Sequence, residues 1–183
     1  MQATPGRQAY TLTELILVMA IIVIVGSISI PVMQTMLADA RFSAAGDSVR
    51  ARLADTRANA MSEGRPWRLG FIANTGMYQL APEDSSEWDN PSQELVQQRD
   101  VIRDELPKDI VFSLNQGDIL NSQQALPAGP GWETIAIYLP DGSARDDATV
   151  YFGKPGMGPN RAVVRGLTGS VSMETFNLKS DLP

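Results

Sequence analysis

The chain has 183 residues, of which 20% are charged, and a formal net charge of −6. It contains no cysteine and no histidine, which excludes disulfides, thiolate metal sites and catalytic pairs that depend on histidine. We therefore expect a folded protein that is not an enzyme and that uses neither a cofactor nor a small-molecule substrate.

The N-terminal part of the chain is strongly apolar. Eleven apolar residues follow one another from Leu15 to Val25, and one carboxylate, Glu14, stands directly before them. As a helix, residues 12–33 are about 33 Å long, which is enough to cross the hydrocarbon core of a membrane. The sequence therefore predicts a single membrane-inserted helix near the N terminus.

Three interpretations of this segment differ in the role that they give to Glu14. In a cleaved secretory signal, Ala38-Asp39-Ala40 is the cleavage site, although it lies about fifteen residues beyond the apolar run. In a plain membrane anchor, Thr11 and Glu14 have the spacing of a capping box, and the helix dipole favours a carboxylate at that end. The third interpretation is a pilin-type processing signal.

The stretch AYTLTELILVMAIIVIVGSISIP resembles the N-terminal motif of type IV pilins and type II secretion pseudopilins. Residues 1–9 correspond to the leader, Tyr10 to the new N terminus, Glu14 to the family's glutamate and Pro31 to its proline. Ala9 stands in place of the usual glycine before the cut, and Tyr10 in place of the usual phenylalanine.

This resemblance implies cleavage between Ala9 and Tyr10 by a prepilin peptidase and methylation of the new N terminus. It also implies a single-pass protein of the inner membrane with its C-terminal domain in the periplasm. The helix of residues 10–33 then forms a filament core with other pilin-like subunits, and Glu14 pairs with the Tyr10 amine of a neighbouring subunit.

Residues 34–64 continue the helical pattern. One apolar stripe runs along them, formed by Phe42, Ala45, Val49, Leu53 and Ala60. Gly64 is a typical helix stop, and Pro31 is expected to kink or loosen the helix because it lacks an N–H. This half of the helix is expected to pack against the domain that follows.

Residues 65–183 change to an alternating, strand-like pattern. The expected strands are residues 67–73, 77–81, 110–114, 134–139, 149–152, 161–165 and 170–176, with turns at Asn74–Gly76, Asp141–Gly142 and Leu167–Gly169. A short helix is expected near Glu94–Arg103, and Gln116–Gly131 is expected to be a long polar connection. The predicted fold is α+β, with one long N-terminal helix packed on an antiparallel β-sandwich of about seven strands.

A second set of residues narrows the resemblance to the GspH/FimT group of minor pseudopilins. The residues that carry it are Arg57, Ala60, Gly64, Asp141, Gly142, Thr168, Gly169 and Val171. The resemblance implies a minor pseudopilin of a type II secretion system. Two alternatives stay open: a minor pilin of a type IV pilus, active in pilus biogenesis or DNA uptake, and a membrane-anchored periplasmic binding or sensor domain.

The distribution of charge along the chain bears on two binding functions, nucleic-acid binding and calcium binding. Residues 66–133 carry four positive and eleven negative side chains, so we expect no nucleic-acid partner, although Arg161 and Arg165 fall on one face of a strand. The carboxylates of residues 82–94, and Asp141, Asp146 and Asp147, have the oxygen ligands that calcium takes but not the spacing of an EF-hand loop.

Overall fold

A computed structural model describes residues 11–89, 94–121 and 127–175, with backbone only for residues 28–32, 34, 35, 121 and 175. The chain divides into two compact units, residues 1–40 and residues 41–183. Helix α1, Leu12–Glu63, contributes to both units.

Helix α1 begins and ends where its sequence signals predict. At its start the N–H of Glu14 donates to Thr11 Oγ1 at 3.3 Å, which is half of the expected capping box. At its end Gly64 has a φ of 68° and donates its N–H to the Ala60 carbonyl at 3.1 Å. Glycine adopts this left-handed conformation without a steric penalty, so it terminates the helix. The helix runs without interruption through position 31, where a kink or loosening was expected.

Crossing a membrane takes a helix of sufficient length and apolar composition, and none of the helices among the described residues has both.

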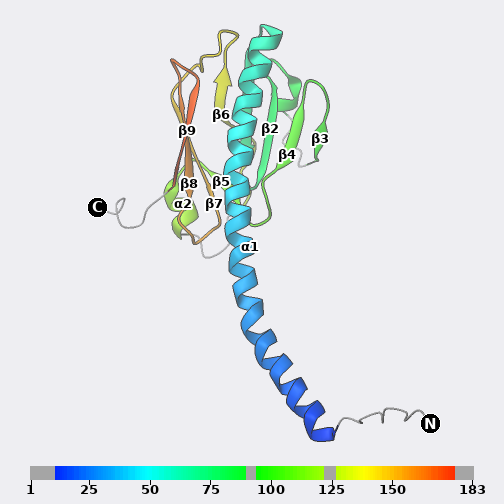
Figure 1. Ribbon diagram of the computed structural model, residues 1–183. Helices are drawn as coiled ribbons and strands as arrows, with labels where there is room; N and C mark the ends of the chain where they lie inside the picture. Colours follow the sequence, from blue (N-terminus) through cyan, green and yellow to red (C-terminus); the bar gives the residue numbers. More distant parts are fainter. Residues whose placement is uncertain (1–10, 90–93, 122–126, 176–183) are drawn as a thin grey trace, which may run out of the picture. The chain divides into compact units, whose positions relative to one another are not determined.

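The described residues of unit 41–183 form nine strands in two antiparallel sheets, rather than the expected number of about seven (Figure 1). The first sheet has the order β3-β4-β2-β1-β6, with β1 Trp67–Ile72, β2 Met77–Pro82, β3 Val96–Gln97, β4 Ile102–Glu105 and β6 Trp132–Tyr138. The second has the order β5-β7-β8-β9, with β5 Val111–Ser113, β7 Ala148–Gly153, β8 Asn160–Arg165 and β9 Ser170–Thr175. A 3-10 turn, η1 Ser86–Trp88, and a short helix, α2 Gln116–Asn121, lie in the connections.

The helix expected near Glu94–Arg103 is wrong, because this segment forms β3 and β4. Strand β4 pairs with β2 in the register Tyr78↔Asp104 and Gln79↔Arg103. The Arg103 side chain is only 2% exposed, so its burial comes from tertiary contacts that a charged, helix-like sequence pattern does not reveal. Helix α2 also lies in a segment expected to be an irregular connection.

The two sheets share one hydrophobic core with the second half of α1. Phe112 of β5 lies between them, with its ring 5.3 Å from Phe71 and 6.4 Å from Phe152. The backbone of Phe112 also bonds to the β1–β2 turn: its N–H donates to the Thr75 carbonyl at 2.8 Å, and its carbonyl accepts from the Asn74 N–H at 2.9 Å. The α+β class with antiparallel sheets and an N-terminal helix is therefore confirmed.

Candidate functional site

Two of the four residues expected to act in processing and assembly can be placed. Ala9 and Tyr10 lie outside the described residues. Glu14 lies in the first turn of α1 and is exposed, next to the capping residue Thr11. Pro31 lies within α1, and only its backbone is described. Glu14 is thus the one proposed assembly side chain with a described environment.

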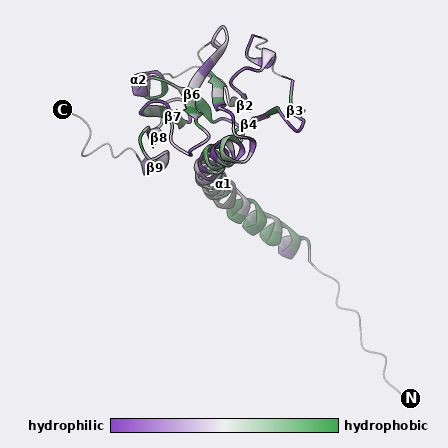
Figure 2. Cartoon of the chain, turned by 90° about the horizontal axis from the view of Figure 1, so that it is seen from above, coloured by the Kyte–Doolittle hydropathy of each residue, from purple (hydrophilic) through white to green (hydrophobic). Residues whose placement is uncertain are grey.

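The stretch that follows Glu14 has its apolar side chains exposed. From Leu15 to Val25 the large apolar side chains are 46% to 69% exposed, and Figure 2 shows this stretch of α1 as continuously hydrophobic. Consecutive helix residues are turned by about 100° from one another, so an unbroken apolar run covers every side of the helix. Such a surface normally lies within apolar surroundings, and the first unit supplies none among its described residues.

The second half of α1 is different, because it buries a single stripe. Ala45, Val49, Leu53 and Ala60 are each at most 2% exposed, and Phe42 packs partly against the same core. The stripe expected from the sequence is therefore confirmed. Thr56 also lies in it with 0% exposure, and the sequence pattern missed it because threonine is polar. Its hydroxyl donates to the Arg52 carbonyl at 2.6 Å, which satisfies the buried polar group within the helix.

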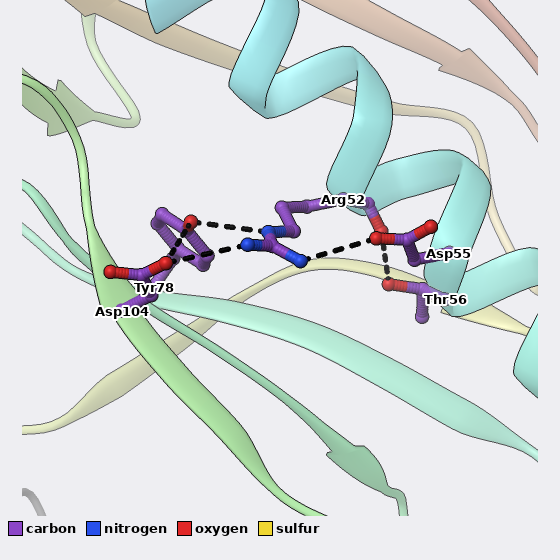
Figure 3. Close-up of polar contacts among 5 residues, drawn as sticks. All are labelled: Arg52, Asp55, Thr56, Tyr78 and Asp104. Atoms are coloured by element: carbon purple, nitrogen blue, oxygen red, sulfur yellow. Dashed lines mark hydrogen bonds and ion pairs between the residues drawn. The ribbon is translucent and has the colours of Figure 1, made fainter. Parts of the chain in front are cut away.

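A polar cluster beside the stripe ties α1 to the first sheet (Figure 3). The Arg52 guanidinium donates to the Tyr78 hydroxyl at 3.2 Å and pairs with Asp104 at 3.3 Å and with Asp55 at 3.2 Å. The Tyr78 hydroxyl itself donates to Asp104 at 3.2 Å. Burial raises the pKa of the Tyr78 phenol, so the hydroxyl keeps the proton that it donates. One arginine thus links the helix to β2 and β4.

The turns that carry the narrower resemblance meet near the C-terminal end of α1. The Arg57 guanidinium donates to the Thr168 carbonyl at 3.1 Å, and the Ala144 N–H donates to the Gly166 carbonyl at 2.8 Å. Gly142 and Gly169 have φ values of 83° and 62°. A Cβ at Gly169 would collide with the Gly142 carbonyl oxygen, so both turns need glycine. Residues far apart in the sequence are therefore packed into one cluster.

Two buried polar groups lie in this cluster. The Tyr138 side chain is 0% exposed, and its hydroxyl has no hydrogen-bond partner among the described residues. Burial raises the pKa of Tyr138 to about 12, and the positive charge of Arg57 opposes this rise. The Nε of Arg57 is likewise buried and without a hydrogen-bond partner in the described part of the chain. The arginine is thus only partly satisfied by its own chain.

A group of arginine and tryptophan side chains covers the first sheet and was not foreseen. The Arg68 guanidinium lies 4.2 Å from the Trp88 ring, which meets the Trp132 ring edge-on at 6.1 Å. The buried Arg103 donates to Gln79 Oε1 at 2.8 Å and pairs with Glu87 at 3.0 Å. Desolvation lowers the pKa of the Arg68 guanidinium, since it is packed under the tryptophan. The sequence signal for this group was the glycine at position 70, within β1. A Cβ at this position would lie too close to the Trp88 ring.

Several of the residues considered for DNA and calcium binding form hydrogen bonds or ion pairs with other surface residues. Arg161 pairs with Glu174, and Arg165 pairs with Asp147 at 3.3 Å. The side-chain hydroxyl and the N–H of Ser143 donate to Asp141, which lowers the pKa of that carboxyl. In the ranges that the structure describes, no group of three or more carboxylates is arranged to hold a metal ion.

Comparison with known proteins finds similar solved structures, among them two of the minor pseudopilin EpsH from the type II secretion system of Vibrio cholerae. One is 12% identical, covers 74% of this chain and 97% of its own, and superposes with a TM-score of 0.48. The other is 15% identical, covers 77% and 97%, and has a TM-score of 0.49. No family model and no curated relative matches the sequence. Sequence identities and TM-scores this low do not assign a function, which therefore has to be inferred from this chain's own residues.

Proposed function

We propose that this protein is a minor pseudopilin subunit, which assembles through the first half of α1 into a periplasmic pseudopilus for type II protein secretion. The observation that carries the proposal is the exposed apolar run Leu15–Val25, preceded by Glu14. Its large side chains are 46% to 69% exposed, and neighbouring subunits cover them in the proposed filament.

In this proposal Glu14 sets the register of assembly. A carboxylate inside an apolar bundle costs roughly 2.5–3.5 kcal/mol on insertion scales unless it meets a partner. The proposed partner is the free amine of Tyr10 on an adjacent subunit, exposed once the leader has been removed. An ion pair is stronger in low-dielectric surroundings. Helices in the correct register therefore gain this attraction between carboxylate and amine, whereas helices in a shifted register leave both charges unpaired.

The proposal also includes the route to the filament. A prepilin peptidase cleaves after Ala9 and the Tyr10 amine is methylated. Before assembly, residues 10–33 hold the subunit in the inner membrane as a single pass, with residues 65–183 in the periplasm. Within this span, Tyr10 lies outside the described residues, and only the backbone of positions 28–32 is described. Cell fractionation and the intact mass of the membrane-extracted protein test these steps, and a chain that begins at Tyr10 with one added methyl group is expected.

The decisive test is a pair of carboxylate substitutions on α1. Glu14→Ala should abolish recovery of other pilin-like subunits with the full-length chain, because the buried partner amine loses its counter-charge. Asp39→Ala is the matched control, since Asp39 is an exposed carboxylate on the same helix, and it should leave that recovery unchanged. Quantitative mass spectrometry of the co-purified proteins measures both.

The result also separates the alternatives. Unchanged partner recovery from Glu14→Ala would overturn the assembly role of Glu14, and failure of the unmodified chain to recover any pilin-like subunit would overturn the proposal and favour a membrane-anchored binding or sensor domain. The identity of the recovered subunits distinguishes a secretion pseudopilus from a type IV pilus. In this proposal Glu14 and the apolar run have the same role in either filament.

A further inference from the structure

The face of the first sheet that turns away from α1 holds a short segment of the chain, residues 84–89, which we call the strap. The residues of β1 and β2 that belong to the core shared with α1 include Leu69, Phe71, Tyr78 and Leu80. Side chains alternate between the two faces of a strand, so Arg68, Gly70 and Gln79 lie on the opposite face. The strap places the ring of Trp88 on this face, against Arg68 and Gly70.

The ring of Trp88 lies in a slot that is shaped for an aromatic side chain. We define the slot by Arg68, Gly70 and Trp132. A Cβ at Gly70 would be 2.7 Å from the Trp88 ring, so only glycine leaves room for it. The Arg68 guanidinium lies over the ring at 4.2 Å from its centroid, and Trp132 meets it edge-on at 6.1 Å. A flat ring therefore gains both a cation–π and an aromatic contact in the slot.

Beside the slot, Arg103 binds the carboxylate that precedes this ring in the strap. The Arg103 side chain is 2% exposed, and its Nη2 pairs with Glu87 at 3.0 Å. Its Nε donates to Gln79 Oε1 at 2.8 Å, and its guanidinium lies 5.3 Å from the Trp132 ring. A buried guanidinium without a counter-charge is strongly destabilising, so this position needs a carboxylate. The face as a whole recognises a carboxylate followed directly by an aromatic ring.

The strap is held in place by side chains rather than by its backbone. Among the described residues, its backbone hydrogen bonds join it only to itself and to Pro82, whose carbonyl also accepts from Trp88 Nε1 at 2.8 Å. None of the residues of η1 is buried. Segments with few backbone bonds to the rest of a domain open at low cost.

Two hydrogen-bond donors on this face are not satisfied while the strap is in place. The Nε2 of Gln79, a side chain with 0% exposure, has no partner in the described part of the chain, and the same holds for the Nε of Arg68. Buried donors without acceptors are costly. A longer peptide supplies acceptors in its backbone carbonyls, which gives it contacts that the strap lacks.

We propose that this face is a docking groove for an acidic segment of a partner protein, in which a carboxylate directly precedes an aromatic residue. The strap occupies the groove with Glu87 and Trp88 until the partner's segment displaces it. The chemistry of the occupant follows from the strap, which is the peptide seated there. This proposal does not depend on assembly into a filament.

A peptide with the sequence of residues 83–89, EDSSEWD, is the probe for the groove. Its binding to the full-length chain in detergent is measured by fluorescence anisotropy. Trp88→Ala empties the slot, and this variant should bind the peptide about tenfold more tightly than the unmodified chain, whose groove is open for only a fraction of the time. Asp84→Asn is the matched control, because Asp84 is an 80% exposed carboxylate of the strap that lies outside the slot. It should bind the peptide as the unmodified chain does.

Changes in the peptide test which groups the groove recognises. A peptide with Glu87→Gln and one with Trp88→Ala should each bind the Trp88→Ala chain about tenfold more weakly than the original peptide, since each lacks one of the two anchors. If the Glu87→Gln peptide binds as well as the original, Arg103 does not select a carboxylate, and the proposal is overturned.

A second chain variant covers a loss of folding in the first, which circular dichroism detects. Glu87→Gln keeps the ring in the slot but removes the counter-charge of Arg103, so this chain should also bind the peptide more tightly than the unmodified chain. If the folded variants bind the peptide no better than the unmodified chain, the strap does not cover a docking groove. Because none of these measurements uses other pilin-like subunits, this failure would leave the proposed function unaffected.

Discussion

The two halves of α1 place the same kind of residue in opposite surroundings. Leu17 and Leu53 belong to one continuous helix, yet Leu17 is 61% exposed and Leu53 is fully buried. Around Leu53 the apolar residues form one stripe, which the two sheets cover. Around Leu17 they form an unbroken run, for which the described part of the first unit has no cover. The period of the apolar pattern, more than its hydrophobicity, therefore shows whether a helix finds its partners inside or outside its own chain.

The largest expected effect comes from shortening these two leucines. Leu53→Ala should lower the free energy of unfolding by about 2–5 kcal/mol, because it leaves a cavity between α1 and the sheets. Leu17→Ala is the matched control on the same helix, and it should change that free energy by less than about 0.5 kcal/mol. Denaturant unfolding of the purified full-length variants measures both. Equal destabilisation by the two variants would mean that the first half of α1 also packs within its own chain.

The features predicted from sequence are those set by local patterns. The ends of α1 were predictable because Thr11 and Gly64 act on their own backbone neighbourhood. Seven strands and the glycine turns were predictable because alternation and turn chemistry are local. Strands β3 and β4 were not, since Arg103 is buried by Gln79 and Glu87, which are distant in sequence and satisfy its charge.

The candidate site likewise contains residues that local sequence patterns predict and contacts that they do not. Glu14 and the apolar run after it follow from spacing alone, whereas the partners that we propose for them lie on other subunits and are not part of a single chain. The turn residues Gly142 and Gly169 were identified by resemblance, but their mutual contact is a tertiary fact. The sequence placed Arg57 on the helix and gave no sign that it reaches the Thr168 carbonyl.

A smaller effect is expected from the polar ties of the second half. Arg52→Ala should lower the free energy of unfolding by about 1–2 kcal/mol, since it removes hydrogen bonds to Tyr78 and to two carboxylates that are partly exposed. Arg50→Ala is the control, because Arg50 is exposed on the same helix and forms no ion pair in the described residues. Thermal unfolding of both variants measures the difference. An Arg50 variant as unstable as the Arg52 variant would show that general charge, and not the cluster, matters.

The smallest expected effect is pH-dependent and concerns Glu83, which accepts two hydrogen bonds from the Arg145 guanidinium, one of them 2.6 Å long. Arg145 holds the pKa of the Glu83 carboxyl below its ordinary value, and Arg68 adds to this. Because the folded state has the lower pKa, this pair stabilises the protein above the carboxyl's unfolded pKa. That stabilisation is lost as the pH falls through the folded pKa.

Glu83→Gln should therefore be less stable than the original chain at about pH 7, and this difference should disappear as the pH falls below the folded pKa of Glu83, where the carboxyl is protonated in both states. The difference at neutral pH should stay below about 1 kcal/mol, because both side chains are partly exposed and solvent screens the pair. Added salt should shrink it further. A difference that persists in acid would show that Glu83 stabilises the fold by packing rather than by charge. This surface pair would then act as the buried stripe of α1 does, despite its exposure.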